Sequence, residues 1–317
     1  MSDQTLRMAF VMDPIEAISI DEDTTFVLML EAQRRGHRIF YVDPASIGVR
    51  LGEPEAVVTE VTLRREAGNH CALGASRRVL LDAEIDVAFQ RVDPPVDAPY
   101  ILATQMLALC RRTRVLNRPE SILAYNEKLF ALHFREWMTE TTVTRSIPEL
   151  RDFLAQMGGE MIVKPLDGRG GEGVFHARAG DPNLESIFEQ ATAFGRRWTM
   201  AQRYLPAVRR GDKRILLLEG EPLGALLRVP AEGESRANLH VGGRAEKTDL
   251  DADDRRIVEA LGPVLAREGL FFVGIDVIGG RLTEVNVTSP TGVQEVNALD
   301  GVCLEARIID RAEERAP

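Results

Sequence analysis

The stretch GIDVIGGRLTEVNVTSP, from Gly274 to Pro290, guides the interpretation of the whole chain. It predicts two strands, Phe271–Ile278 and Leu282–Val287, because both segments are rich in β-branched residues. The pair Gly279-Gly280 lies between them and favours a tight turn. The sequence therefore predicts a β-hairpin near the C-terminal end of the chain.

The loop length decides which side chains share a face of this hairpin. A two-residue loop places Asp276 opposite Thr283, with Glu284 and Asn286 on the other face. A three-residue loop over residues 279–281 places Asp276 opposite Glu284, with Asn286 on the same side. Only the second register gathers apolar side chains and Thr283 on one face, namely Ile275, Val277, Thr283, Val285 and Val287. We therefore predict the three-residue loop.

In this register Asp276, Glu284 and Asn286 form a set of hard oxygen donors on rigid strands. Such donors suit Mg²⁺ that also carries substrate phosphates. A solvated hairpin face is the ordinary alternative, since these residue types are usually exposed. Strands disfavour Asp and Asn, however, so their joint presence needs a reason. The magnesium hypothesis depends on residues elsewhere that would hold phosphates.

Composition limits the classes of protein to consider. A chain of 317 residues predicts about two or three domains. The net charge of -10 excludes the basic field expected of a nucleic-acid-binding protein. We also expect no membrane association, because no apolar run approaches ~20 residues and no signal peptide is recognisable. The cysteines Cys71, Cys110 and Cys303 form no CxxC pattern, which favours a reducing cytoplasm without disulfides or a zinc site.

The N-terminal part alternates strands and helices, which predicts a parallel α/β layer. The expected elements are strand Leu6–Val11, helix Phe26–Arg35, strand Arg38–Val42, strand Val87–Arg91, helix Ile101–Arg112 and strand Val115–Asn117. Thr24 or Thr25 is expected to cap the first helix. Residues 48–80 are weakly patterned and are interpreted as a surface excursion. Ligands usually bind at loops such as Met12–Ile20 and Arg91–Asp97, although their prolines alternatively serve only to end the strands.

A glycine-rich loop, Asp167–Gly173, follows a predicted strand Met161–Pro165, and Val174–Ala177 is expected to return beside it. Glycines let backbone N–H groups approach phosphate oxygens without obstruction by side chains. The loop lacks the Walker pattern and opens a strand rather than a helix, so it is not a dinucleotide fingerprint. Lys164, just before the loop, is a candidate phosphate ligand, with an ordinary surface lysine as the alternative.

Three arginines, Arg214, Arg228 and Arg236, lie in and just after another predicted hairpin, Ile215–Leu218 with Leu223–Val229. Guanidinium groups bind carboxylates and phosphates through two hydrogen bonds. Surface salt bridges are the alternative for any one of them. Together they indicate a site for an anionic ligand in an otherwise acidic protein.

At this point several segments resemble one family, the bacterial glutathione synthetases, within the ATP-grasp carboxylate–amine ligases. The matching segments are MDPI at Met12–Ile15, LEAQRRG at Leu30–Gly36, DPP at Asp93–Pro95, NEKLF at Asn126–Phe130, KPLDGRGG at Lys164–Gly171, GDKR at Gly211–Arg214 and FVGIDVIGGRLTEVNVTSPTG at Phe272–Gly292. Each segment alone is weak evidence, but their order and spacing are specific. The resemblance covers nearly the whole chain.

The resemblance implies an α/β and α+β multidomain fold: an N-terminal α/β domain at residues 1–122, a central ATP-grasp lid domain at 123–203 and a C-terminal ATP-grasp catalytic domain at 204–317. ATP would lie between the last two. The implied ATP-binding residues are Lys128, Lys164, Gly168, Arg169, Gly170, Gly171, Gln202, Arg203, Tyr204, Leu205 and Asp212. The implied peptide-binding residues are Asp13, Asp93, Arg228, Arg236, Asn238, Ser289 and Thr291. Arg214, Arg228 and Arg236 would be catalytic.

The implied reaction joins γ-glutamylcysteine to glycine at the expense of ATP, through an acyl phosphate. Mg²⁺, with Mn²⁺ as a substitute, would bind Asp276, Glu284 and Asn286. Two alternatives stay open: a related ligase that uses another acid or amine, and a non-catalytic nucleotide-binding regulator. The resemblance also implies a cytoplasmic homotetramer.

Overall fold

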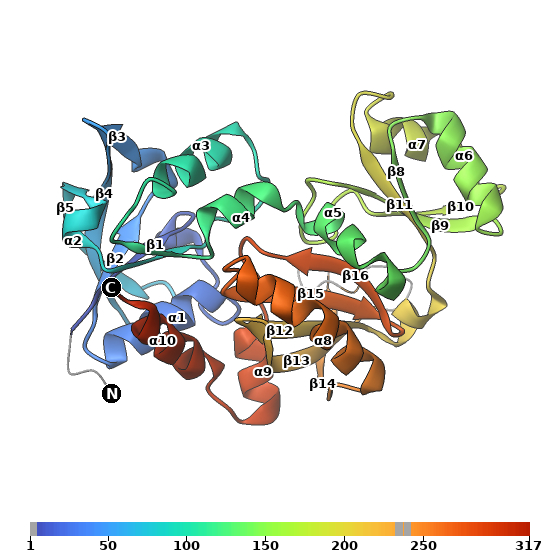
Figure 1. Ribbon diagram of the computed structural model, residues 1–317. Coiled ribbons are helices and arrows are strands. Elements are labelled where there is room, and N and C mark those ends of the chain that lie inside the picture. Colours follow the sequence, from blue (N-terminus) through green and yellow to red (C-terminus); the bar gives the residue numbers. More distant parts are fainter. Residues whose placement is uncertain (1–4, 232–236, 238–241) are drawn as a thin grey trace.

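The computed structural model describes residues 5–231, 237 and 242–317, which form three β-sheets with their covering helices (Figure 1). The N-terminal sheet lies at the left of the figure, a sheet from the middle of the chain at the upper right, and the third sheet between them. Among the described residues, no helix has the length and apolar character needed to span a membrane. The fold combines α/β and α+β parts, as predicted.

The N-terminal sheet is built around parallel strands, which confirms the prediction from the alternating pattern. The parallel strands are β1 (Arg7–Val11), β2 (Arg38–Val42), β6 (Val87–Gln90) and β7 (Arg114–Leu116). The helices of this part are α1 (Thr24–Arg34), α2 (Leu81–Glu84), α3 (Ala98–Leu107) and α4 (Pro119–Ala124). Because β1 and β6 are parallel neighbours, the loops that follow them leave the sheet at the same edge.

The predicted cap of α1 is wrong. Asp23 caps the helix, and its carboxylate accepts a hydrogen bond from the N–H of Phe26 at 2.7 Å. Thr24 and Thr25 are both buried in the first turn instead. Aspartate, like threonine, is a preferred cap residue, so the sequence alone did not separate the three candidates.

The predicted range of α3, Ile101–Arg112, is displaced toward the C-terminus. The helix begins after Asp97, whose side chain accepts a hydrogen bond from the N–H of Tyr100. It ends at Leu107 because the N–H groups of residues 111–113 donate to the carboxylate of Asp82, which holds the chain in a turn there. A long-range contact therefore overrides local helix propensity.

Residues 48–80 extend the sheet, which corrects their interpretation as a surface excursion. They form β3 (Gly48–Arg50), β4 (Glu53–Leu63) and β5 (Cys71–Leu80), with β4 antiparallel to β2. Most of β5 is exposed. At the end of this hairpin, the ring Nε2 of buried His70 lies 2.7 Å from the carbonyl oxygen of Ile15. The hairpin thereby supports the loop that follows β1.

The middle of the chain forms a four-stranded antiparallel sheet in the order β10-β9-β11-β8. Its strands are β8 (Thr141–Thr144), β9 (Glu160–Pro165), β10 (Phe175–Arg178) and β11 (Thr199–Arg203), and α6 (Ile147–Gln156) and α7 (Leu184–Thr192) cover it. The short helix α5 (Glu127–Ala131) precedes this sheet and is capped by Asn126. The glycine-rich loop connects β9 to β10, as predicted.

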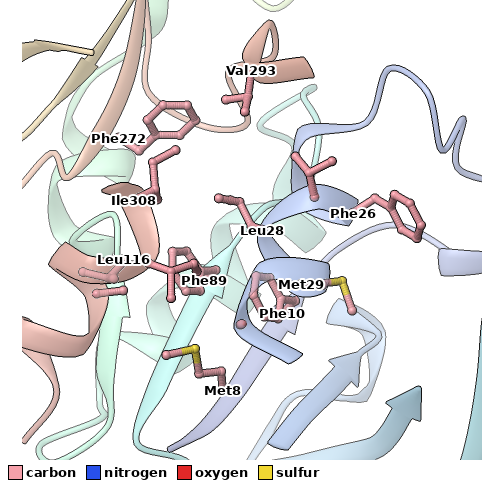
Figure 2. Close-up of a cluster of buried hydrophobic side chains, with 14 of the residues drawn as sticks. Met8, Phe10, Phe26, Leu28, Met29, Phe89, Leu116, Phe272, Val293 and Ile308 are labelled. Atoms are coloured by element: carbon pink, nitrogen blue, oxygen red, sulfur yellow. The ribbon is translucent and has the colours of Figure 1, made fainter. Parts of the chain in front are cut away.

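The third sheet has the order β14-β13-β12-β15-β16. Its strands are β12 (Asp212–Leu218), β13 (Glu221–Val229), β14 (Arg244–Lys247), β15 (Phe272–Ile278) and β16 (Arg281–Asn286). The remaining helices are α8 (Ala252–Arg267), α9 (Val293–Asp300) and α10 (Leu304–Arg315). Figure 2 shows Phe272, Val293 and Ile308 in one apolar cluster with Phe10 and Phe89 of the N-terminal sheet. This shared core fixes the two sheets against each other.

The turn between β15 and β16 differs from the three-residue loop that we predicted. Ile278 pairs with Arg281, so the turn contains only Gly279 and Gly280, both at positive φ (+56° and +74°). Two positive φ values are typical of the type I′ turn, whose twist matches that of the strands. A shift in register between Asp276 and Val277 absorbs the extra residue as a β-bulge.

Because of the bulge, the two-residue turn gives the same pairing of polar residues that we predicted from a three-residue loop. Asp276 lies opposite Glu284, and Gly274 lies opposite Asn286, as the predicted register requires. The apolar face contains Leu282 where we expected Thr283. The hydroxyl of Thr283 instead donates to the carbonyl oxygen of Asp276 at 3.1 Å. The grouping of the three polar side chains is thus confirmed, although the predicted turn length is wrong.

Candidate active site

A cavity of about 730 Å³ is lined by all three sheets and the loops around them. Its volume is within the range of small-molecule sites. The predicted site residues that line it are Asp13, Asp93, Lys128, Lys164, Gly168, Arg169, Gly170, Gly171, Gln202, Arg203, Tyr204, Leu205, Asp212, Arg214, Arg228, Asp276, Glu284, Asn286, Ser289 and Thr291. Arg236 and Asn238 lie outside the described residues. The fold therefore brings together every predicted site residue that the structure describes.

The hairpin carboxylate of Asp276 is paired with two guanidinium groups. Arg214 contacts it through two hydrogen bonds of 2.5 and 3.0 Å, and Arg228 approaches to 3.0 Å. Burial raises the pKa of Asp276, but the charges of Arg214 and Arg228 more than offset this and hold it well below its usual range. Asp276 is therefore ionised throughout the physiological pH range.

The second hairpin carboxylate, Glu284, contacts Lys128 at 3.0 Å. Burial raises the pKa of Glu284, whereas the charges of Lys128 and Lys164 lower it and determine the net direction. The amide nitrogen of Asn286 donates to the carbonyl oxygen of Gly274 at 3.2 Å, which leaves its amide oxygen as an acceptor.

These three side chains fit a hard cation by the chemistry of their oxygen atoms. The carboxylates, however, are already paired with arginine and lysine side chains. Within residues 5–231, 237 and 242–317, no group of three His, Cys, Asp or Glu side chains is placed to hold a metal ion. A divalent cation here would therefore depend on oxygens that a ligand brings with it.

Two buried lysines, Lys128 and Lys164, contact the β15–β16 hairpin, and Lys128 also contacts the glycine-rich loop. The ammonium group of Lys128 donates to the carbonyl oxygen of Gly168 at 2.7 Å as well as to Glu284. Lys164 donates only to the carbonyl oxygen of Thr283 at 3.2 Å, and among the described residues no carboxylate lies within ion-pair distance of it. Burial lowers the pKa of Lys164. An unpaired buried cation is costly, so this position favours an anionic ligand.

The glycine-rich loop packs closely at its start. A Cβ atom on Gly168 would lie 2.7 Å from Cγ of Pro165 and 3.0 Å from the carbonyl oxygen of Glu172. Gly170 and Gly171 have φ values of +57° and +84°, which residues with side chains rarely adopt. The backbone of this loop can therefore approach a ligand in a way that other residues would prevent.

Two polar atoms near the arginines have no partner among the described residues. Arg228 donates to Asp212 through Nη2, while its Nε and the Oδ1 of Asp212 are buried without a hydrogen bond. Burial raises the pKa of Asp212 to about 6, although Arg228 opposes this shift. Buried unsatisfied groups in a cavity wall are typical of a site that a ligand completes.

The segment from Gln202 to Leu205 forms another part of the wall. The side-chain amide of Gln202 donates to the hydroxyl of Thr141 at 3.2 Å, and the ring of Tyr204 stacks on His176 with a centroid distance of 4.0 Å. Ile162 and Val208 also line the cavity there. This combination of apolar side chains, an aromatic ring and a side-chain amide suits a flat aromatic ligand.

The glycine-rich loop also contacts the N-terminal part. Arg169 pairs with Asp93 at 2.5 Å, and the N–H of Asp93 donates to the carboxylate of Asp13 at 3.0 Å. Thr291 accepts a hydrogen bond from Arg214 through its carbonyl oxygen at 3.2 Å. The loops after β1 and β6, which we predicted as ligand-binding loops, both line the same cavity.

Comparison with known proteins identifies the family. Residues 6–122 match the model of the prokaryotic glutathione synthetase N-terminal domain, and residues 127–301 match that of the prokaryotic glutathione synthetase ATP-grasp domain. The chain belongs to the prokaryotic glutathione synthetase family. It is an ATP-dependent ligase with an ATP-grasp fold.

Relatives in this family match over nearly their full length. Glutathione synthetase from Parasynechococcus marenigrum (strain WH8102) is 48% identical over 308 residues, which are 96% of this chain and 98% of the relative. The enzyme of the same name from Mesorhizobium japonicum is 45% identical over 97% of this chain and 98% of its own length. The prokaryotic glutathione synthetase resemblance seen in the sequence is thereby confirmed.

Solved structures with lower identity share the fold. The crystal structure of D-cycloserine synthetase DcsG has a TM-score of 0.68 and 16% identity, and the match covers 97% of this chain and 99% of that one. A structure of the ATP-grasp ligase PsnB complexed with a minimal precursor has a TM-score of 0.63 and 17% identity over 98% and 99% of the two chains. At this identity the likeness shows only that the glutathione synthetase family shares the ATP-grasp architecture.

Glu127 and Arg91 also line the cavity, and neither was given a role of its own from the sequence, although Arg91 begins the predicted ligand-binding loop Arg91–Asp97. Glu127 accepts hydrogen bonds from the N–H groups of Val287 and Thr288 and from the Thr288 hydroxyl, at 2.8–3.0 Å. It thereby ties α5 to the segment after β16. Arg91 directly follows β6. Glu127 stands next to Lys128 in a family segment, but no spacing rule links it to residues 160 positions away.

Proposed function

We propose that the protein joins γ-glutamylcysteine to glycine with ATP, giving glutathione, ADP and phosphate. One observation carries this proposal: a single cavity is lined by a glycine-rich loop, by the buried cation of Lys164, which has no carboxylate partner among the described residues, and by the carboxylate pair Asp276 and Glu284. The names of the full-length relatives support the choice of substrates.

The proposed chemistry follows from the low reactivity of a carboxylate. The cysteinyl carboxylate oxygen attacks the γ-phosphorus of ATP, the bond to the bridging oxygen breaks, and ADP leaves. The neutral amine of glycine then attacks the acyl carbon, and phosphate leaves with the former carboxylate oxygen while the amine loses a proton. No protein nucleophile is required for either step.

In this proposal Lys128, Lys164 and the glycine-rich loop bind and orient the phosphates. Arg214 and Arg228, with Arg236 from outside the described residues, stabilise charge that develops on the transferred phosphoryl group and on the tetrahedral oxygen. Closure of the glycine-rich loop excludes water from the acyl phosphate.

Asp276, Glu284 and Asn286 would hold Mg²⁺ together with phosphate oxygens, and Mn²⁺ would substitute for it. When bound, the ion neutralises part of the charge on the triphosphate. The charges nearby support such an ion, because Lys128, Arg214 and Arg228 already pair with carboxylates. Of the four cations named above that the structure describes, only Lys164 has no such partner there. A polyanionic ligand therefore needs additional positive charge.

We also propose three domains, at residues 1–122, 123–203 and 204–317. The separation of the described strands into three sheets supports this division. The homotetramer and the cytoplasmic location stay predictions from the family resemblance.

The substrates are tested by measuring ADP release and glutathione formation with each substrate supplied singly and together. We expect sustained ADP release only when ATP, γ-glutamylcysteine and glycine are all present, with glutathione formed in equal amount. Strong ADP release without glycine, or none with all three, would contradict the choice of substrates. ATP binding without product from any acid and amine pair would indicate a nucleotide-binding regulator.

A further inference from the structure

Arg91, at the end of β6, is a buried cation in the cavity wall that lacks a carboxylate partner. Its side chain donates through Nε to the hydroxyl of Thr25 at 3.1 Å and through Nη2 to the carbonyl oxygen of Pro290 at 2.9 Å. The residue is 5% exposed, and its guanidinium lies 5.7 Å from the ring centroid of Phe272. Among the described residues, no carboxylate lies within ion-pair distance of it.

This arrangement is costly unless a ligand completes it. The desolvation of a charged side chain is offset only by an opposite charge and by hydrogen bonds. Arg91 has two neutral acceptors, and its third nitrogen, Nη1, makes no hydrogen bond to the part of the chain that the structure describes. Burial lowers the pKa of Arg91, but arginine stays protonated in proteins. The guanidinium of Arg91 therefore presents a positive charge to a ligand in this part of the cavity.

The position of Arg91 separates it from the lysines proposed to bind phosphates. Its contacts are the first turn of α1 and the segment after β16, whereas Lys164 lies on β9 and contacts Thr283. The carboxylates of Asp23 and Asp93, which line the same cavity, are near enough for their charges to act on Arg91. Asp23 accepts the capping hydrogen bond from Phe26 and, like Arg91, has no ion pair among the described residues.

A guanidinium beside carboxylates is complementary to the zwitterionic head of an α-amino acid. In a γ-linked glutamyl peptide this head is free, because the peptide bond is formed by the side-chain carboxyl group. It therefore lies at the opposite end of the substrate from the cysteinyl carboxylate that is phosphorylated. In an ordinary α-linked peptide the α-carboxyl group of the first residue is used in the peptide bond. Such a peptide therefore has no free α-carboxylate beside its α-ammonium group at the end remote from the phosphorylated carboxylate.

We propose that Arg91 binds the α-carboxylate of the γ-glutamyl residue and that Asp23, on the same wall, receives its α-ammonium group. Arg91 is then a specificity-determining residue that selects γ-linked substrates. This inference rests on the proposed function, since it assigns one end of the dipeptide substrate. It concerns residues that neither the family segments nor the predicted site residues include.

The proposal is tested with two analogues that each lack one charged group. The analogue 4-aminobutanoyl-cysteine lacks the α-carboxylate, and glutaryl-cysteine lacks the α-amine. The readout is the ratio of kcat/KM for γ-glutamylcysteine to that for each analogue, measured in the same preparation. Because the ratio is internal to one preparation, loss of folded protein does not change it.

In the wild-type protein we expect γ-glutamylcysteine to be preferred to 4-aminobutanoyl-cysteine by at least about 10²-fold, as for loss of a buried charge partner. Arg91→Met should reduce that preference to within about threefold, by removing the group that recognises the carboxylate. It should leave the preference over glutaryl-cysteine largely intact. Arg91→Lys retains the charge but not the planar fork and should give an intermediate ratio.

Arg7→Met is the matched control. Arg7 lies at the amino end of β1, on the same sheet, and pairs with Asp86 away from the cavity. This variant should lose stability but keep both ratios of the wild type. If Arg91 had only a structural role, Arg91→Met would behave like this control, with lower activity on all substrates and an unchanged preference. That result would overturn the proposal.

The substrate preference of the wild-type protein is by itself a test of the proposal. Equal use of γ-glutamylcysteine and 4-aminobutanoyl-cysteine would overturn the role of Arg91 without affecting the proposed function, since glutathione would still form. Absence of glutathione from γ-glutamylcysteine itself would instead overturn the proposed function. The comparison of Arg91→Lys with wild type remains informative even when Arg91→Met yields no folded protein.

Discussion

Replacing Lys164 with Met is expected to lower kcat by about 10²–10³-fold, the usual effect of removing one group that stabilises transition-state charge. The same change should stabilise the unliganded protein. Lys164 is 7% exposed and is not paired with any carboxylate of the described residues. Its charge is therefore unfavourable until a ligand arrives, and its removal should raise the free energy of unfolding by about 1–3 kcal/mol. Steady-state rates and denaturant unfolding measure the two effects.

The pH dependence of stability provides an independent check. Because the pKa of Lys164 is lowered in the folded state, the folded protein loses this proton at a lower pH than the unfolded chain does. Between those two pKa values the unfolded chain binds more protons, so stability rises with pH in that window. The wild-type protein should show this contribution, and Lys164→Met should lack it.

Lys213→Met is the matched control for both effects. Lys213 lies on β12 but pairs with Asp251 and Asp254, outside the cavity wall. Its replacement should destabilise the protein and leave kcat close to the wild-type value. If Lys164→Met were destabilised like the control, or kept wild-type activity, the assignment of Lys164 as an unpaired phosphate ligand would be wrong.

Replacing Asp276 with Asn is expected to lower both activity and stability. The carboxylate is 3% exposed and pairs with Arg214 and Arg228, so the amide would leave two buried guanidinium groups without their shared partner. Breaking a buried ion pair in this way costs about 3–5 kcal/mol. Turnover should fall by about 10²-fold or more, since the substitution also disturbs the groups that stabilise transition-state charge.

The metal role of Asp276 is separated from its structural role by the magnesium dependence. Asp276→Asn should require a higher Mg²⁺ concentration for its half-maximal rate, measured at a temperature where the variant is folded. Asp86→Asn, which removes the partner of Arg7 far from the cavity, should lose stability without this shift. An unchanged Mg²⁺ requirement in folded Asp276→Asn would count against metal binding by this carboxylate.

The stability of Asp276→Asn should also respond to acid differently from the wild type. The folded-state pKa of Asp276 lies below its unfolded value, so its ionised form contributes stability that is complete above the unfolded pKa. This contribution is lost as pH falls through the folded pKa. The difference in stability between wild type and variant should therefore narrow as the pH is lowered through the acidic range, as measured by thermal unfolding.

The parts of the fold that depend on local pattern could be predicted from the sequence. Alternation of apolar residues fixed the pairing of Asp276 with Glu284, because any other register would have buried polar side chains. The turn itself could not be predicted, since Gly279-Gly280 permits both a short loop with a bulge and a longer loop without one. The same limit applies to α3, whose end is set by the distant carboxylate of Asp82.

The residues of the candidate site also divide into those that local sequence could predict and those that it could not. Lys128, Lys164 and the glycine-rich loop belong to segments with recognisable spacing. Arg91 lies in the predicted ligand-binding loop Arg91–Asp97, but its own role and that of Glu127 could not be predicted, because these depend on partners far along the chain, such as Pro290 and Thr288. Arg91 is buried and pairs with no carboxylate of the described residues, a property that depends on the folded structure and not on local sequence.

The transfer of oxygen from substrate to phosphate tests the central claim most directly. The dipeptide γ-glutamylcysteine would be prepared with ¹⁸O in its cysteinyl carboxylate and incubated with ATP, glycine and the enzyme. If ATP activates this carboxylate as an acyl phosphate, each phosphate released should carry one ¹⁸O atom from the labelled group, detected by mass spectrometry. Formation of glutathione with unlabelled phosphate would contradict the acyl phosphate and the roles assigned to the residues around it.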